Sequence, residues 1–414
     1  MFNGANTGFM LLAASLVMLM TPGLAFFYGG LVGRSSTLTI MIQSFASMGI
    51  TTVLWWLIGY SLCFSGGAGD IYGNFDLAFL RGVGPEDMYA PSGIPLTVLI
   101  VYQMMFAIIT PALITGAFTN RVSFKAYLIF LVVWQLFVYY PFVHMVWGGG
   151  LLAEWGVRDF AGGLVVHISA GFAALASVLY VGSRKFRDTP HNIPFIALGT
   201  GLLWFGWYGF NAGSELKVDN ITALAFLNTD IAASFAAVTW MFIEWGHAKK
   251  PHFVGLLTGA VAGLATITPA AGFIPIWSAV VIGIAAGGIC YLAVQMKNSL
   301  KWDDALDVWG VHGVGGLLGI VLLGVLGSTA INPAGGEGLI YGSASFFGKQ
   351  LAAGFGAAAY AFGFTYLMLW VINKITPVRV SEAHEIGLDE AMHGESAYLL
   401  DDDDAPAPAL APVS

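Results

Sequence analysis

Two histidines, His167 and His312, are the residues of this sequence whose positions best predict chemistry. Both lie inside long apolar stretches, whereas five of the other histidines fall in polar segments and His144 lies near the end of a stretch. An ionisable side chain inside a bilayer is costly, so it generally faces a cavity, a transport path or a polar partner. A neutral imidazole offers one hydrogen-bond donor and one acceptor. The pair therefore predicts a polar path through an apolar bundle, the alternative being histidines that only pack.

Acidic residues in or beside the apolar stretches form a second group. Asp159 stands where a stretch begins, and a carboxylate there can cap the first N–H groups of a helix. We favour this structural role for Asp159 over direct contact with a substrate. Asp230 lies within another stretch and needs a polar partner, which the sequence does not name. Asp307 and Glu244 lie near helix ends, where pairing at the helix terminus is expected.

The two cysteines, Cys63 and Cys290, both lie in apolar stretches. A cysteine in such surroundings is usually a small packing residue rather than half of a disulfide or a metal ligand. The sequence therefore predicts neither a metal site nor a cofactor.

The elements that position these residues must be membrane-spanning helices. Of 414 residues, 57% are hydrophobic and only 10% are charged, whereas a soluble domain carries about 25% charge. This composition excludes a soluble enzyme, and apolar stretches of more than about 18 residues indicate helices rather than a β-barrel. The expected stretches are 7–32, 37–64, 95–118, 124–146, 160–182, 194–213, 221–244, 252–269, 274–296, 306–328 and 343–372. The boundary between the eighth and ninth rests only on the short segment 269–275.

The predicted fold class is an all-α polytopic membrane protein with eleven transmembrane helices, arranged as two inverted five-helix repeats and a final helix. A faint internal echo supports the repeat. Asp159–His167 begins the fifth stretch and Asp307–His312 begins the tenth, each with an acid, glycine and Val-His, although the spacings differ. Counting about 1.5 Å per residue from opposite ends leaves the two histidines about 10 Å apart in depth, so their contact does not follow from spacing.

The charge distribution predicts the orientation. The net charge of -8 belongs to the tail, because residues 381–414 contain no Lys or Arg, whereas residues 1–380, the transmembrane domain, are nearly neutral. Lys and Arg favour the cytoplasmic side, and all but four of the 16 lie on one side. The exceptions are Arg81, Arg158, Lys217 and Lys349. We expect a protein of the cell (inner or plasma) membrane with its N-terminus outside and residues 381–414 in the cytoplasm, about the last 15 being disordered.

Four motifs closely resemble the ammonium transporter family, which includes methylammonium permeases and Rhesus proteins. They are Asp159-Phe-Ala-Gly-Gly-Leu-Val-Val-His167, Gly206-Trp-Tyr-Gly-Phe210-Asn-Ala-Gly-Ser214, Gly310-Val-His312-Gly and His144-Met-Val-Trp147-Gly-Gly-Gly. The resemblance extends from about Asn6 to Tyr398. It implies a homotrimer whose subunits each contain a narrow pore for ammonium or ammonia, with methylammonium as a surrogate substrate. Neither enzymatic activity nor a nucleic-acid partner is expected.

The resemblance also implies roles for individual residues. His167 and His312 become the paired pore histidines, sharing a hydrogen bond between their rings. The outer recruitment site would contain Trp147, Ser214 and Phe106, the gate below it Phe106 and Phe210, and Asp159 would be needed nearby. These residue types suit a cation, because an aromatic face attracts one by about 0.5–2 kcal/mol and a hydroxyl accepts from N–H. With 30 phenylalanines in the chain, composition alone singles out none.

Energetics favours passage of the neutral form. Moving a small ammonium-like ion into a low-dielectric medium costs on the order of 20 kcal/mol. Removing a proton at pH 7 from an alkyl ammonium with a pKa of about 10.4 costs only about 4–5 kcal/mol. We therefore expect the cation to be recognised outside, to lose its proton near the phenylalanines, and to pass the imidazoles as ammonia. The imidazoles could relay the proton separately, and the pore is expected to be shut at the phenylalanines.

Two other functions stay open at this point. One is an ammonium sensor that binds without conducting. The other is a membrane redox protein in which the two histidines are axial haem ligands. In the tail, Gly387–Tyr398 resembles the cytoplasmic segment of the family, which implies a trimeric PII-type signal protein as a partner.

Overall fold

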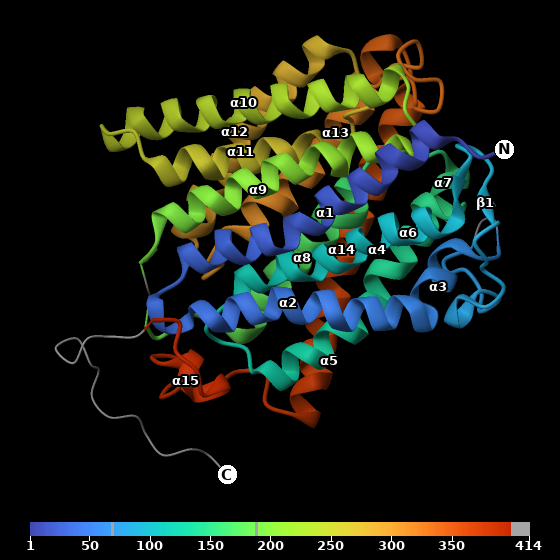
Figure 1. The fold of residues 1–414 in the computed structure, drawn as a ribbon. Coiled ribbons are helices and arrows are strands. Elements are labelled where there is room, and N and C mark those ends of the chain that lie inside the picture. The colour runs from blue at the N-terminus through green and yellow to red at the C-terminus, as the bar shows by residue number, and fades with distance from the viewer. Residues whose placement is uncertain (68–69, 187–188, 399–414) are drawn as a thin grey trace.

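The computed structural model describes residues 1–67, 70–186 and 189–398, which fold into one bundle of helices running in opposite directions (Figure 1). Ten helical spans in this part of the chain are long and apolar enough to cross a membrane, and α11 is a shorter apolar helix. Together they account for the eleven predicted stretches, and the all-α polytopic fold is confirmed.

Several spans join α-helices to short 3-10 or π-helical segments. The first five spans are α1 (Gly4–Leu31), η1 to α3 (Arg34–Ser36, α2 Thr37–Leu54, η2 Trp55–Gly59, α3 Tyr60–Phe64), α4 (Leu96–Phe118), α5 to α6 (Phe124–Trp134, η4 Gln135–Tyr139, α6 Tyr140–Trp147) and η5 with α8 (Gly163–Ile168, Ser169–Val181). The other six are α9 with η6 (Ile193–Ala212, Gly213–Glu215), α10 (Asn220–Ala248), α11 (Phe253–Ile267), α12 (Ile276–Ser299), η7 with α13 (Trp309–Gly313, Val314–Leu326) and α14 (Ala344–Ile375). The connecting elements are η3 (Ala78–Leu80), β1 (Met88–Tyr89), β2 (Ile94–Pro95), α7 (Leu151–Trp155), η8 (Leu339–Tyr341) and α15 (Leu388–His393).

The boundary between the eighth and ninth spans lies where two prolines interrupt the helix. Helix α11 ends at Ile267, and α12 begins at Ile276 with Pro275 as its N-cap residue. Proline cannot continue a helix because it lacks an N–H and its ring clashes with the preceding turn. Pro269 and Pro275 therefore keep α11 short and separate it from α12.

Glycines allow helices to approach closely at two crossings, that of α9 with α1 and that of α8 with η7. A Cβ on Gly199 of α9 would lie 2.3 Å from the Phe27 nitrogen of α1, and one on Gly171 of α8 would lie 2.1 Å from the Gly313 nitrogen of η7. No side chain fits at either distance. Small residues of this kind let membrane helices pack against each other. Here Gly199 brings the first and sixth spans together, and Gly171 brings the fifth and tenth together.

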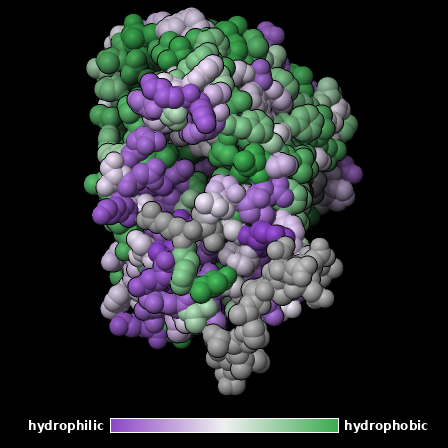
Figure 2. Space-filling model, turned by 90° about the vertical axis from the view of Figure 1, so that its left-hand side faces the viewer, coloured by the Kyte–Doolittle hydropathy of each residue, from purple (hydrophilic) through white to green (hydrophobic). Residues whose placement is uncertain are grey.

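The bundle has two distinct ends. The N-terminus, β1, α3 and α7 lie at one end, hereafter the N-terminal end, and α15 lies at the other, hereafter the tail end (Figure 1). Figure 2 looks onto the tail end, where hydrophilic residues gather. Asp389 of α15 accepts hydrogen bonds from the backbone nitrogens of Leu38 (2.9 Å) and Thr39 (2.7 Å), which fixes α15 to the start of α2. The disorder predicted for the last residues concerns 399–414, outside the described residues.

Candidate functional site

The two intramembrane histidines meet at the centre of the bundle. Their Nδ1 atoms lie 3.2 Å apart, and the ring centroids are 5.2 Å apart at an interplanar angle of 22°. A hydrogen bond between two Nδ1 atoms holds a single proton, so one ring donates and the other accepts. When neutral, the accepting ring carries its own proton on Nε2. His167 and His312 thus form the shared hydrogen bond that the family resemblance implied. The packing of the two spans removes the difference in depth that counting residues along each helix had suggested.

Asp159 caps the segment that carries His167. Its two carboxylate oxygens accept hydrogen bonds of 2.7–3.1 Å from four consecutive backbone nitrogens, those of Gly162, Gly163, Leu164 and Val165. The residue is 5% exposed, and burial raises the pKa of its carboxyl group although the four N–H groups oppose that shift. This is the structural role favoured from the sequence. The segment itself, η5, is π-helical, as is η7 around His312.

Asp304, rather than Asp307, is the matching cap of the tenth span, so the echo inferred from the sequence paired the wrong acid. Asp304 accepts from the backbone nitrogens of Val308 (3.1 Å) and Trp309 (2.7 Å). It stands eight residues before His312, as Asp159 stands eight before His167. That equal spacing was the signal in the sequence. Asp307 instead adopts a φ of 59° and forms an ion pair.

Trp147 and Ser214 lie at the N-terminal end of the path. The indole nitrogen of Trp147 donates to the carbonyl of Asp159 (2.9 Å), which orients the ring. The Ser214 hydroxyl donates to the carbonyl of Phe210 (2.9 Å), so its lone pairs can accept a hydrogen bond from a cation. Tyr102, which the sequence did not single out, places its hydroxyl 3.2 Å from that of Ser214.

Two phenylalanine rings close the path below these residues. The centroids of Phe106 and Phe210 are 4.2 Å apart at 31°, and each residue is only 1% exposed. The Phe106 and Trp147 rings meet edge to face with their centroids 5.9 Å apart, and the centroids of the Phe210 and His167 rings are 6.1 Å apart. A continuous row of aromatic rings therefore leads from the N-terminal end to the histidines, and Phe106 and Phe210 are in contact within it.

The row of rings continues into two cavities. A cavity of about 10 Å³ is lined by Phe210, Trp207 and both histidines, a size near the lower limit for one water molecule. The Nε2 atom of His167 is buried and has no hydrogen-bond partner among the described residues. Beyond His312, a larger cavity of about 210 Å³ extends toward the tail end.

Trp207 is a second residue that the sequence reasoning missed. Its ring stacks on His167 with centroids 5.5 Å apart, and its indole nitrogen donates to the Thr268 hydroxyl (2.9 Å). The residue lies within the motif Gly206 to Ser214, so the motif itself was the signal. Trp207 holds one face of the imidazole and keeps that side of the path apolar.

The remaining singled-out residues lie in other surroundings. Asp230 finds its partners on α9, accepting from the Tyr208 hydroxyl (2.6 Å) and from the Trp204 indole (3.2 Å). Glu244 pairs with His252 near a helix end, as expected. Both cysteines, Cys63 and Cys290, are buried free thiols.

The histidine pair does not fit the haem hypothesis. Axial ligation by two histidines requires a flat macrocycle between the rings. Here the two Nδ1 atoms are 3.2 Å apart, and the adjoining cavity measures about 10 Å³. A porphyrin cannot enter that space without separating the fifth and tenth spans.

Fold and site together define a polytopic membrane protein whose helical bundle holds two hydrogen-bonded imidazoles beside a stack of aromatic rings. The profile of the Ammonium Transporter Family matches residues 8–398. An ammonium transporter of Bacillus subtilis is 44% identical over 399 residues, covering 95% of this chain and 98% of that protein. The crystal structure of Saccharomyces cerevisiae Mep2 superimposes with a TM-score of 0.85 at 35% identity, covering 92% of this chain and 88% of that chain. A solved structure titled "Sensor Amt Protein" gives a TM-score of 0.85 at 28% identity, covering 94% and 98%.

The chain belongs to the ammonium transporter family. Its relatives are membrane transporters, and their shared fold accounts for the eleven spans of this chain.

Proposed function

We propose that this chain transports ammonium by recruiting the cation at the N-terminal end, removing its proton near the phenylalanines and conducting ammonia past the histidines. Trp147 and Ser214 bind the cation through the ring face and the hydroxyl lone pairs, and Phe106 completes the site. Phe106 and Phe210 separate this site from the interior. The protein is channel-like and has no enzymatic role.

The observation that carries this proposal is the unbroken sequence of groups along one path. Uncharged cation-binding groups come first, then stacked apolar rings, then two hydrogen-bonded imidazoles, then a cavity open toward the tail end. Carrying a bare cation through the ring stack costs on the order of 20 kcal/mol, several times the about 4–5 kcal/mol for deprotonation at pH 7. The imidazole pair accepts and donates hydrogen bonds to ammonia and can pass a proton along the Nδ1 contact.

The decisive experiment records current and internal pH in proteoliposomes after ammonium addition, comparing the wild type with His167→Ala. The wild type should give a response that saturates with ammonium and is shared by methylammonium. His167→Ala should lose the current, because one member of the proton relay is gone, while residual ammonia passage still alkalinises the lumen. A matched control is His247→Ala, a histidine near the end of α10, which should behave as the wild type does. An unresponsive wild type would overturn the transport mechanism.

A non-conducting sensor is the second candidate, and one observation favours it. The fold of this chain matches that of the sensor protein over nearly its full length. The same recording separates the two functions, because a sensor would bind methylammonium to the purified protein without any current or pH change.

We further propose a homotrimer in the cell membrane, with the N-terminal end outside and the tail end in the cytoplasm. The distribution of Lys and Arg supports this orientation. The tail segment Gly387–Tyr398, with α15 packed on the bundle, supports a cytoplasmic contact with a trimeric PII-type signal protein. Accessibility of single cysteines at either end to an impermeant thiol reagent tests the orientation, and light scattering of the purified protein tests the trimer.

A further inference from the structure

Lys297 is a buried cation at the tail end that the transport mechanism leaves unexplained. It lies in the last turns of α12, and its side chain is only 7% exposed. Its ammonium group forms a 2.6 Å ion pair with the carboxylate of Asp307 and donates a 2.8 Å hydrogen bond to the carbonyl of Asp304. A lysine held by two such contacts has a fixed position.

Asp307 faces the larger cavity beyond the histidines. It lines that cavity together with His312, and its side chain is 30% exposed. The residue is held in the left-handed region with a φ of 59°, a conformation that a non-glycine residue adopts at some cost. The loop thus turns the carboxylate toward the space into which the pore opens.

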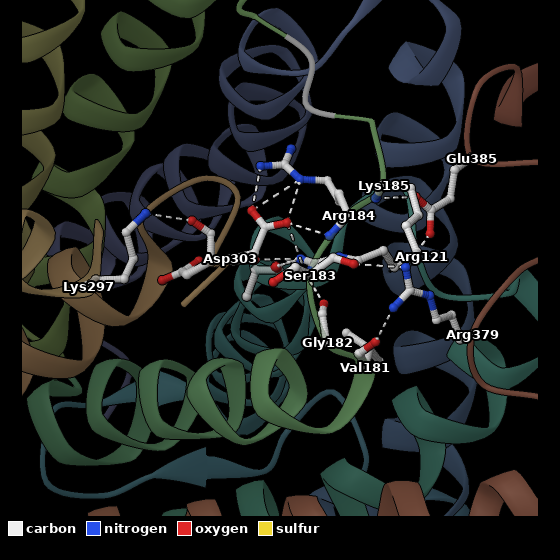
Figure 3. Close-up of polar contacts among 12 residues, drawn as sticks. Arg121, Val181, Gly182, Ser183, Arg184, Lys185, Lys297, Asp303, Arg379 and Glu385 are labelled. Carbon is white, nitrogen blue, oxygen red and sulfur yellow. Dashed lines mark hydrogen bonds and ion pairs between the residues drawn. The ribbon is translucent and has the colours of Figure 1, made fainter. Parts of the chain in front are cut away.

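The charges around this cavity balance. Arg184 also lines the cavity, but Asp303 binds its guanidinium at 2.8 Å and lies 3.7 Å from Arg121 (Figure 3). The cluster around this loop contains three bases and three acids, Arg121, Arg184, Lys297, Asp303, Asp304 and Asp307, and the neighbouring Arg379 is paired with Glu385. With all six ionised, the pore exit has no net charge, and Lys297 is the residue that balances Asp307.

We propose that Lys297 is a positioning residue that keeps the exit cavity from holding a cation, by neutralising Asp307 beside His312. The inference rests on the proposed transport function. Ammonia that passes the histidines takes up, in this cavity, the proton that the imidazole pair relays from the outer site, and it must then leave as ammonium. An unpaired carboxylate in a confined cavity attracts cations strongly, because the field is poorly screened there. The Lys297 ion pair removes that attraction, so the product leaves instead of occupying the exit.

The transport test measures how methylammonium inside proteoliposomes inhibits its own uptake from outside. In Lys297→Met, the internal concentration that halves uptake should fall by about tenfold or more, because an unbalanced carboxylate at contact distance is worth at least that factor. The outer KM should stay unchanged. The double variant Lys297→Met with Asp307→Asn restores the charge balance and should return to the wild-type value, as should Lys297→Arg.

A binding test keeps this inference separate from the transport proposal. Crystals soaked in RbCl should show an anomalous Rb⁺ peak beside Asp307 in Lys297→Met, and no peak there in the wild type or the double variant. This result does not require the protein to transport anything, so an inactive wild type would overturn the transport proposal alone.

Three results would overturn the role of Lys297. They are a Rb⁺ peak already present in the wild type, no peak in Lys297→Met, or equal internal inhibition in the single and double variants. If Lys297→Met fails to fold, Lys297→Gln makes the same predictions, because its amide can retain the hydrogen bond to the Asp304 carbonyl while lacking the charge.

Discussion

The fifth and tenth spans each begin with a buried aspartate that caps the helix, but the two aspartates differ in their charged neighbours. Asp159 and Asp304 each cap a π-helical start eight residues before a histidine. Asp159 satisfies its charge with four backbone N–H groups and forms no ion pair with Lys or Arg among the described residues. Asp304 receives only two N–H groups and shares its loop with Asp303 and Asp307, which pair with Arg184 and Lys297 from outside the loop.

The partners of the two capping acids, backbone N–H groups for Asp159 and a loop of ion pairs around Asp304, distinguish the two ends of the proposed path. At the N-terminal end, the buried carboxylate of Asp159 is fully engaged by the backbone. Under the proposed mechanism, a cation there meets an aromatic face and a hydroxyl that bind it only moderately. At the tail end, Asp307 and Arg184 line a cavity, and Lys297 is the cationic partner that Asp307 needs there. Under the proposed mechanism, similar caps thus serve a recruiting end and a releasing end.

The largest effect should come from weakening the two caps in parallel. Asp159→Asn replaces an acceptor of four N–H groups with an amide that can serve about two, whereas Asp304→Asn loses one of two. Each buried donor left unpaired costs about 1–3 kcal/mol. We expect Asp159→Asn to lower the melting temperature in detergent about twice as much and to abolish methylammonium uptake. Equal losses in the two variants would show that the backbone contacts do not distinguish them.

A methyl group at the crossing of the two spans should break the histidine contact. Gly171→Ala places a Cβ 2.1 Å from the Gly313 nitrogen, so α8 and η7 must separate. Overpacking of this kind costs about 1–3 kcal/mol, and uptake should fall steeply because the rings of His167 and His312 part. The control is Gly356→Ala on α14, where no atom lies within 4 Å of the new Cβ, and it should match the wild type. Normal uptake by Gly171→Ala would contradict the role of this crossing.

The pH dependence of stability should reveal the cost of ionising the buried Asp304 carboxyl group at the tail end. Burial raises the pKa of Asp304 from 3.8 to about 6, so the folded state binds its proton more tightly than the unfolded chain does. Protonation of Asp304 therefore contributes on the order of 3 kcal/mol to the free energy of unfolding. This stabilisation is fully present below about pH 4 and is lost as the pH rises through about 6. Asp304→Asn should flatten the fall in melting temperature between pH 4.5 and 7.

The neighbouring acid should behave in the opposite way. The guanidinium groups of Arg184 and Arg121 hold the pKa of Asp303 down at about 2, so its contribution is present above about pH 4 and lost as pH falls through about 2. Asp303→Asn should leave the slope between pH 4.5 and 7 unchanged. Identical slopes for both variants and the wild type would refute this assignment.

The smallest effect should be on recruitment. Trp147→Ala removes one aromatic face worth about 0.5–2 kcal/mol to a cation, which raises the outer KM for methylammonium by about 2- to 30-fold. Inhibition by internal methylammonium should not change, because the ring lies at the other end of the path. Trp370→Ala, on the exposed face of α14, serves as the control, and a shift in internal inhibition with Trp147→Ala would argue against separate ends.

The sequence alone determined the spans and the residue types along the path. A segment that spans a bilayer as a helix must be long and apolar. Hydropathy therefore located all eleven stretches to within a few residues, and prolines marked the end of the shortest one. His167 and His312 stood out because ionisable groups are rare within such stretches. The motif around Phe210 also contained Trp207, although nothing in the residue type marked its ring as part of the path.

Only the tertiary structure decided which of these residues meet. The contact of His167 with His312 depends on how closely two spans cross, which glycines at Gly171 and Gly313 permit. The equal eight-residue spacing to the histidines favoured Asp304 over Asp307 as the cap, but only the path of the loop shows that its carboxylate reaches the backbone nitrogens. Hydropathy is a property of each segment, whereas contacts, caps and charge balance are properties of pairs, and pairs are fixed only by packing.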